Sequence, residues 1–92
     1  MHSASFTVLA RHNDSSEPRL GLAIAKRQIR KASARNRIKR LIRESFRQHL
    51  TLLRGLDLVV MARSGVQTKE NAAIFRELED IWQKLSKRCE PS

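Results

Sequence analysis

The spacing of hydrophobic residues predicts three β-strands. In residues 5–11 and 19–25, every second residue is apolar. In a β-strand these alternate side chains point to the same face of the sheet, so the pattern predicts strands with one buried face. Residues 56–63 are almost continuously apolar, which predicts a central strand that is buried on both faces. Residues 12–18 are rich in turn formers, so we expect a hairpin loop between the first two strands.

Small side chains line one side of the second predicted strand, namely Gly21, Ala23 and Ala25. Such a side allows a ligand or another chain to approach the backbone closely, and it equally suits tight packing against a helix. The sequence alone leaves both interpretations open.

Helical spacing of apolar residues predicts two helices. The first covers residues 33–53, with Ser33 as its N-cap and Gly55 close to its C-terminal stop. The second covers residues 71–88, where Phe75 and Trp82 lie beside an apolar stripe; they could stack on bases, but this spacing favours the core. The order is then β-β-α-β-α, with the third strand parallel to the second, which predicts an α+β fold in a single domain of residues 1–92.

The positive charge is concentrated in residues 26–47. This segment holds ten Lys or Arg residues and one acid, Glu44, so it carries +9 of the formal net charge of +10. On the predicted helix, the basic residues project from the side opposite to the apolar residues. A charged helix face can simply be solvated, but a solvated face normally mixes signs, whereas like charges here lie four residues apart and repel. The pattern therefore favours a surface that binds a polyanion.

No catalytic pattern accompanies this basic surface. His2, His12 and His49 have no spacing that indicates a metal site, and the carboxylates form no recognisable two-metal pair. The one cysteine, Cys89, allows no intramolecular disulfide and favours a reducing compartment. The longest apolar run is too short to span a bilayer, and the first residues lack the pattern of a signal peptide. We expect a cytoplasmic binding protein without a membrane partner, a metal site or catalytic residues of its own.

The residues of the basic helix resemble a known signature, the RNR motif of the bacterial ribonuclease P protein subunit. The matching positions are Ile29, Ala32, Arg35, Asn36, Arg37, Ile38, Lys39, Arg40, Ile42 and Arg43. Residues 19–27, 44–47 and 57–63 also resemble that family, so the resemblance covers nearly the whole chain. It implies a fold similar to the second domain of ribosomal protein S5, with a left-handed β-α-β crossover.

The resemblance also implies that an N-terminal helix is missing, so we expect an N-terminally truncated domain. Family members place that helix over the sheet. The face left uncovered is then expected to be covered by a homodimer or by segment exchange.

By this resemblance, the chain is the accessory subunit of an endoribonuclease whose RNA subunit performs the chemistry. The RNA subunit, with bound Mg²⁺, hydrolyses the phosphodiester that joins the 5′ leader to precursor tRNA. The alternative is a ribosomal-protein-like binder of structured RNA with no role in tRNA processing. A DNA-binding protein is disfavoured, because neither a heptad zipper nor a helix-turn-helix pattern is present.

The resemblance implies two groups of site residues. Those expected to contact the RNA subunit are Arg35, Asn36, Arg37, Lys39, Arg40, Arg43 and Arg47. Arg37 projects between the apolar and basic faces and could instead pair with an acid of the chain itself. Those expected near the leader are Thr7, Leu9, Ala23, Ala25, Lys26, Arg27 and Arg63. Leu9 stands where several family members have an aromatic residue and offers less for a base to stack on, so we expect docking on the RNA subunit to survive truncation better than leader recognition.

Overall fold

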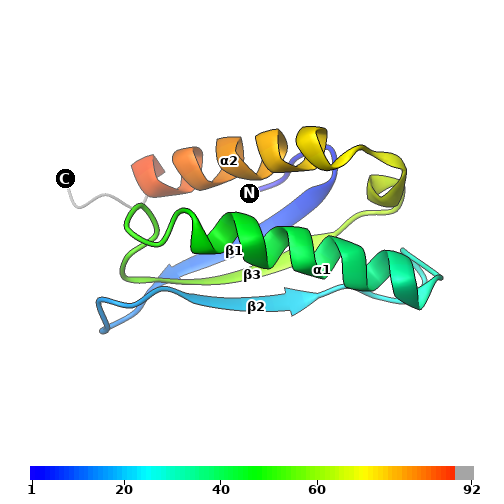
Figure 1. Ribbon diagram of the computed structural model, residues 1–92. Coiled ribbons are helices and arrows are strands. Elements are labelled where there is room, and N and C mark those ends of the chain that lie inside the picture. Colours follow the sequence, from blue (N-terminus) through cyan, green and yellow to red (C-terminus); the bar gives the residue numbers. More distant parts are fainter. Residues whose placement is uncertain (89–92) are drawn as a thin grey trace.

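The structure, a computed structural model, describes residues 1–88, so Cys89 lies outside the described residues. Its strands are β1 (Phe6–His12), β2 (Arg19–Ala23) and β3 (Leu56–Ala62), and its α-helices are α1 (Ala32–Arg47) and α2 (Asn71–Arg88) (Figure 1). A short 3₁₀ helix, η1 (Val66–Thr68), precedes α2. The element order β-β-α-β-α and the α+β class agree with the prediction from the sequence.

The central strand of the sheet is β3, which pairs antiparallel with β1 and parallel with β2. The predicted hairpin between β1 and β2 is therefore wrong, because β3 lies between them. The connecting loop instead passes the start of β3. The backbone N–H of Asn13 donates to the Gly55 carbonyl at 2.8 Å, and the side-chain Nδ2 of Asn13 donates to the Asp57 carboxylate at 2.8 Å. Turn-forming residues indicate that a chain reverses, but not which strand it then pairs with.

Both α-helices lie on the same face of the sheet, and the chain passes from β2 through α1 to β3 (Figure 1). In Figure 1, α1 lies in front of the sheet, β2 runs from left to right, and β3 lies above β2 and is parallel to it. When the view is turned so that both strands point upward, β3 lies to the left of β2. The crossover is therefore left-handed, as the resemblance implies and contrary to the general rule for such units.

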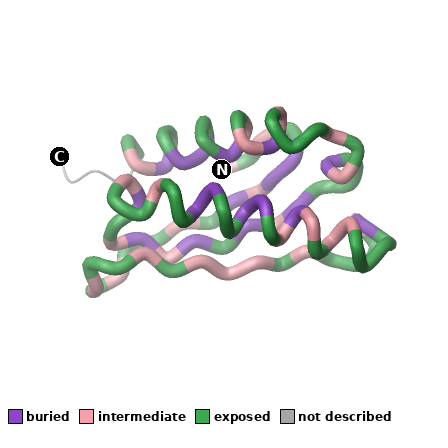
Figure 2. The backbone as a smooth tube through the Cα atoms, in the orientation of Figure 1, coloured by how far each residue is buried: buried purple, intermediate pink, exposed green. Residues whose placement is uncertain are grey.

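Only the helix-facing side of the sheet is buried (Figure 2). On that side Phe6 and Val60 are completely buried, whereas Leu9 is 58% and Val59 is 40% exposed on the other side. The prediction that β3 is buried on both faces is wrong, although its central position is correct. An apolar run predicts burial on both faces only where helices cover both, and here nothing among the described residues covers the second face.

The basic helix α1 is shorter than the predicted helix and starts one residue earlier. Its N-cap is Lys31, which makes no side-chain capping hydrogen bond, so Ser33 lies inside the first turn and the predicted cap is wrong. It ends at Arg47, and turns follow as far as Gly55, which has a φ of 78°. Propensity alone would continue the helix, but Leu53 is completely buried and the chain must turn to bring it into the core.

The core joins α1 to α2 through Trp82, which is completely buried as predicted. Its Nε1–H donates to the Oγ of Ser45 at 2.9 Å, and its ring meets Phe46 edge to face with centroids 6.3 Å apart. A buried indole N–H needs an acceptor, and Ser45 is the one that α1 supplies. Phe75 is partly buried against the same core.

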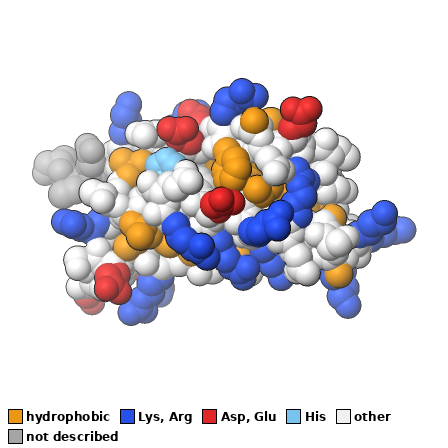
Figure 3. Space-filling model, viewed as in Figure 1, with side chains coloured by type: hydrophobic (Ala, Val, Ile, Leu, Met, Phe, Trp, Pro, Cys, Tyr) orange, Lys and Arg blue, Asp and Glu red, His pale blue; other side chains and the backbone are white. Residues whose placement is uncertain are grey.

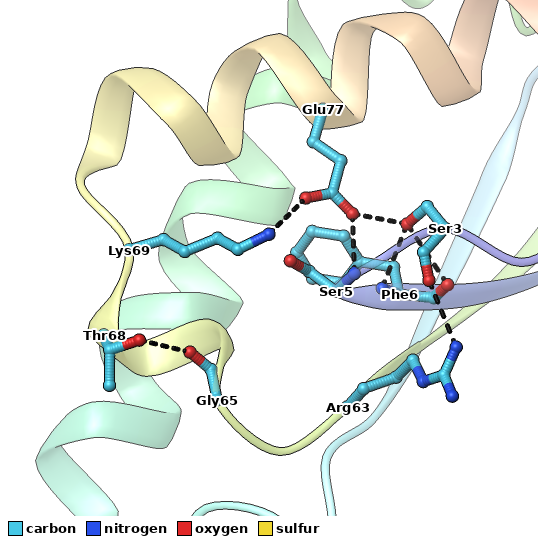
Figure 4. Close-up of polar contacts among 8 residues, drawn as sticks. All are labelled: Ser3, Ser5, Phe6, Arg63, Gly65, Thr68, Lys69 and Glu77. Atoms are coloured by element: carbon cyan, nitrogen blue, oxygen red, sulfur yellow. Dashed lines mark hydrogen bonds and ion pairs between the residues drawn. The ribbon is translucent and has the colours of Figure 1, made fainter.

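Glu77 ties the start of the chain to α2 (Figure 4). Its carboxylate accepts hydrogen bonds from the Ser3 hydroxyl and from the Ser5 backbone N–H, the latter at 2.8 Å, and it pairs with the Lys69 ammonium at 3.2 Å. Burial would raise the pKa of Glu77, but the hydrogen bonds from Ser3, Ser5 and Lys69 outweigh it and hold the pKa below its ordinary value. The charged form of Glu77 is therefore the form that the fold stabilises.

Replacing Ser45 with alanine should leave the buried Trp82 N–H without an acceptor. We expect Ser45→Ala to lower the free energy of unfolding by about 1 to 3 kcal/mol, measured by urea denaturation. Ser33→Ala, at an exposed position of the same helix, is the control and should change it by no more than about 0.5 kcal/mol. Equal effects of the two variants would contradict the role of the Ser45 hydroxyl.

The lowered pKa of Glu77 predicts a loss of stability in acid. Its pKa is lower in the folded than in the unfolded chain, so its contribution is complete above the ordinary value of 4.5 and is lost as the pH falls through the folded value. The wild type should thus exceed Glu77→Gln in free energy of unfolding at pH 7, and this difference should shrink in acid. Glu79→Gln, which makes the same substitution at an exposed position of α2, is the control for the loss of one carboxylate. A difference for Glu77→Gln that does not depend on pH would refute this account.

Candidate nucleic-acid interface

The outer face of α1 carries a row of polar and basic side chains, which we call the α1 stripe: Asn36, Lys39, Arg40, Arg43 and Arg47. All are exposed except Lys39, which is half-buried. The opposite side of α1 is buried, so packing of that side directs the stripe to solvent. Lys and Arg side chains gather along α1 in the space-filling view (Figure 3).

The positive charges of the α1 stripe are not neutralised within the described part of the chain. Residues 1–88 form three ion pairs, Arg11 with Asp57, Lys69 with Glu77 and Lys84 with Asp80, and none includes a residue of the stripe. Glu44 is the one acid on α1 and lies outside all three pairs. Like charges at this spacing repel, so an anionic partner would relieve a cost that the free protein bears.

Arg35 has a local role next to the α1 stripe. Its Nη1 donates to the carbonyl oxygens of Ile29 and Arg30, at 2.9 and 2.8 Å. These bonds attach the loop before α1 to the first turn of the helix, which has no side-chain cap. The same loop carries Lys26 and Arg27, which are exposed. Arg35 thus holds the loop that carries Lys26 and Arg27 against the N-terminal part of α1.

Arg37 points away from the α1 stripe, toward the start of α2. Its guanidinium donates to the backbone carbonyls of Gln67 and Lys69, at 3.1 and 2.7 Å, and to the Oδ1 of Asn71, at 3.0 Å from Nε and 2.6 Å from Nη2. The expected alternative, an intramolecular contact, is therefore present, but its acceptors are carbonyl and amide oxygens and not an acid. The structure does not bring Arg37 together with the other residues predicted to contact RNA.

The open face of the sheet holds several of the residues expected near a leader. Pairing places Thr7, Met61 and Ala23 in one row, and Leu9, Val59 and Gly21 in the next. The side of β2 that carries Gly21 and Ala23 therefore lies on the open face and is not packed against a helix. Of the two interpretations of these small side chains, close approach by a ligand or another chain is the one that the fold allows. Ala25 and the basic pair Lys26 and Arg27 follow beyond β2 and are exposed, while Arg63 donates to the Ser3 carbonyl at 3.2 Å.

Two basic residues of this face were missed in the sequence. Arg11 and Arg19 flank Asp57 in the row after Leu9 and Val59, and the five residues help to line a hollow of about 450 Å³. Arg11 lies 3.7 Å from the Asp57 carboxylate. The period of two along each strand was the signal that could have found them, because Arg11 is two residues from Leu9 and Arg19 is two from Gly21.

Two further properties bear on what this interface could hold. No group of three or more His, Cys, Asp or Glu residues within residues 1–88 is arranged to bind a metal ion. Neither helix of the described chain combines the length and the hydrophobicity that a membrane crossing needs.

Comparison with known proteins places this geometry in a family. The sequence model of the family described as Ribonuclease P matches residues 1–86. The ribonuclease P protein component of Pseudoalteromonas atlantica is 51% identical over 90 residues, which cover 98% of this chain and 75% of that protein. The ribonuclease P protein component of Pseudoalteromonas translucida is 44% identical over 86 residues, which cover 94% of this chain and 61% of that protein.

A solved structure agrees with these sequence matches. The structure of a Staphylococcus aureus RNase P protein mutant with defective mRNA degradation activity superimposes with a TM-score of 0.84 at 31% identity, over 95% of this chain and 73% of that one. The fold, the basic helix and the sequence thus lead to one assignment, and the chain belongs to the ribonuclease P protein family.

Proposed function

We propose that this chain binds the RNA subunit of a bacterial ribonuclease P through the α1 stripe and assists the removal of the 5′ leader from precursor tRNA. The observation that carries the proposal is the row of basic side chains on one rigid helix, none of them in an ion pair within residues 1–88. Membership of the family supports the same partner over the ribosomal-protein-like alternative.

The side chains of the α1 stripe suit contacts to a folded RNA backbone. Arg40, Arg43 and Arg47 offer planar forks that can donate two hydrogen bonds to one phosphate, and Lys39 offers a point charge. Asn36 can both donate and accept, so it can pair with a base edge or a ribose hydroxyl. Neutralising phosphates releases counterions, which makes such binding strongly dependent on salt.

We assign the 5′ leader to the open face of the sheet. Leu9 and Val59 are exposed there, and Lys26 and Arg27 lie beyond the end of β2. A flat apolar surface beside basic side chains suits single-stranded RNA, whose bases can rest on the surface while its phosphates meet the charges. The same face is the one expected to self-associate, and a homodimer through it stays a prediction.

In this proposal the RNA subunit holds the Mg²⁺ ions and performs the hydrolysis, and the protein contributes binding. The ions are assigned to the RNA because the resemblance to the ribonuclease P protein subunit implies it. Lowering the repulsion between RNA subunit and precursor is a task that a cationic protein can perform without touching the reacting phosphodiester.

The charges of the α1 stripe can be tested with Arg40→Ala/Arg43→Ala. We expect this variant to weaken binding of a bacterial ribonuclease P RNA and to reduce stimulation of precursor-tRNA cleavage at low Mg²⁺. The slope of log affinity against log salt should fall by about 0.7 to 0.9 for each phosphate that the variant no longer neutralises. Filter binding at several salt concentrations and a cleavage assay measure the two effects.

The matched control is Arg76→Ala/Lys87→Ala, which removes two positive charges from exposed positions of α2. It should retain nearly wild-type affinity and slope. Equal losses in the two double variants would mean that total charge, and not the α1 stripe, determines binding. A wild-type chain that does not bind the ribonuclease P RNA would direct attention to another structured RNA.

The leader assignment can be tested with Val59→Glu, which puts a negative charge on the open sheet face. We expect the holoenzyme to lose severalfold in affinity for precursor tRNA while its affinity for mature tRNA is unchanged, because like charges repel a leader that only the precursor carries. Thr51→Glu, which adds the same charge at an exposed position away from this face, is the control. Equal losses for precursor and mature tRNA would contradict the assignment.

A further inference from the structure

The Arg37 side chain is nearly saturated with partners from its own chain. A guanidinium has five N–H donors, and the four hydrogen bonds to Gln67, Lys69 and Asn71 use all three of its nitrogens. At most one donor is left for an external acceptor. The acceptors belong to Gln67 in η1, to Lys69 just after η1 and to Asn71 at the start of α2, thirty or more positions along the chain. The contact is therefore a tertiary one, which ties α1 to the segment that begins α2.

Within residues 1–88, this contact is one of two polar contacts between α1 and residues 67–88. The other is the hydrogen bond from Trp82 to Ser45. Residues 37 and 45 are separated by about 12 Å along the helix axis, at 1.5 Å per residue. Two attachment points at this separation fix both the direction of α1 and its rotation about its axis. The Arg37 contact is the more important of the two for the N-terminal part of α1, because the helix begins without a side-chain cap.

Asn36 and Arg40 lie one residue before and three residues after Arg37, so the orientation of both depends on how this part of α1 is held. We propose that Arg37 is a positioning residue, which keeps Asn36 and Arg40 in place for RNA through its contact with residues 67–71 and makes no contact with RNA itself. The inference rests on the proposed function of the α1 stripe and changes the role that the resemblance implies for Arg37. The buried Ile38 keeps the helix folded, while Arg37 sets its orientation.

The geometry of the contact distinguishes Arg37 from a phosphate ligand. Lysine keeps the positive charge of arginine, but one ammonium cannot reach acceptors on three residues spread around a planar fork. Arg37→Lys should therefore weaken binding about as much as Arg37→Ala, although it keeps the charge. Asn71 supplies a test without any change at Arg37, because Asn71→Ala removes an acceptor but no charge, and Asn71→Asp keeps an acceptor at the same place.

The experiment measures binding of bacterial ribonuclease P RNA at several salt concentrations, well below the Tm of each variant, with folding checked by circular dichroism. We expect Arg37→Lys, Arg37→Ala and Asn71→Ala to bind between about twofold and thirtyfold more weakly than the wild type. Their slopes of log affinity against log salt should equal that of the wild type, because the same number of phosphates is neutralised. Asn71→Asp should bind nearly as well as the wild type.

Three results would overturn the inference. If Arg37→Ala lowers the salt slope by about 0.7 to 0.9 while Arg37→Lys binds normally, Arg37 contacts a phosphate directly. If the variants lower only the Tm and leave the affinity unchanged, Arg37 stabilises the fold without positioning the α1 stripe. A wild-type chain that fails to bind the RNA at all would overturn the proposed function and this inference with it, and that result is distinct from the first two.

Discussion

The burial of one side of α1 is the constraint on which the rest of the structure depends. Ile38, Leu41, Ile42 and Phe46 face the core, and they can do so only if the other side of the helix stays in water. That other side is where the charge is concentrated. The core thus determines the direction in which the basic residues point, and their mutual repulsion is a cost that hydrophobic burial outweighs.

The sequence was sufficient for what depends on local periodicity. It predicted three strands, two helices, their order and the bounds of α2, because each follows from the spacing of apolar residues along a short segment. The parallel pairing of β2 with β3 was predicted from the helix that connects them. The composition and position of the basic segment were equally local properties. The face of α1 opposite to the core follows from a helical projection alone.

The remaining features depend on contacts between segments far apart in the sequence. Placement of β3 between β1 and β2 cannot be inferred from turn-forming residues, and the exposure of Val59 depends on where the helices lie. The early end of α1 follows from burial of Leu53, since no helix-breaking residue lies between them. Arg37 belongs to an arginine-rich motif, and only the position of residues 67–71 reveals that its guanidinium is used within the molecule.

The strand order also has a consequence for the time at which this protein can fold. Since β1 and β2 each pair only with β3, no two strands of the sheet can associate until residues 56–62 have been synthesised. Until then α1 has neither the complete sheet nor α2 to pack against, so a nascent chain exposes both its apolar and its cationic side. The basic segment is thus available to RNA on the ribosome before its apolar side is buried, and the newly made chain must complete its last third to withdraw that apolar surface from solvent.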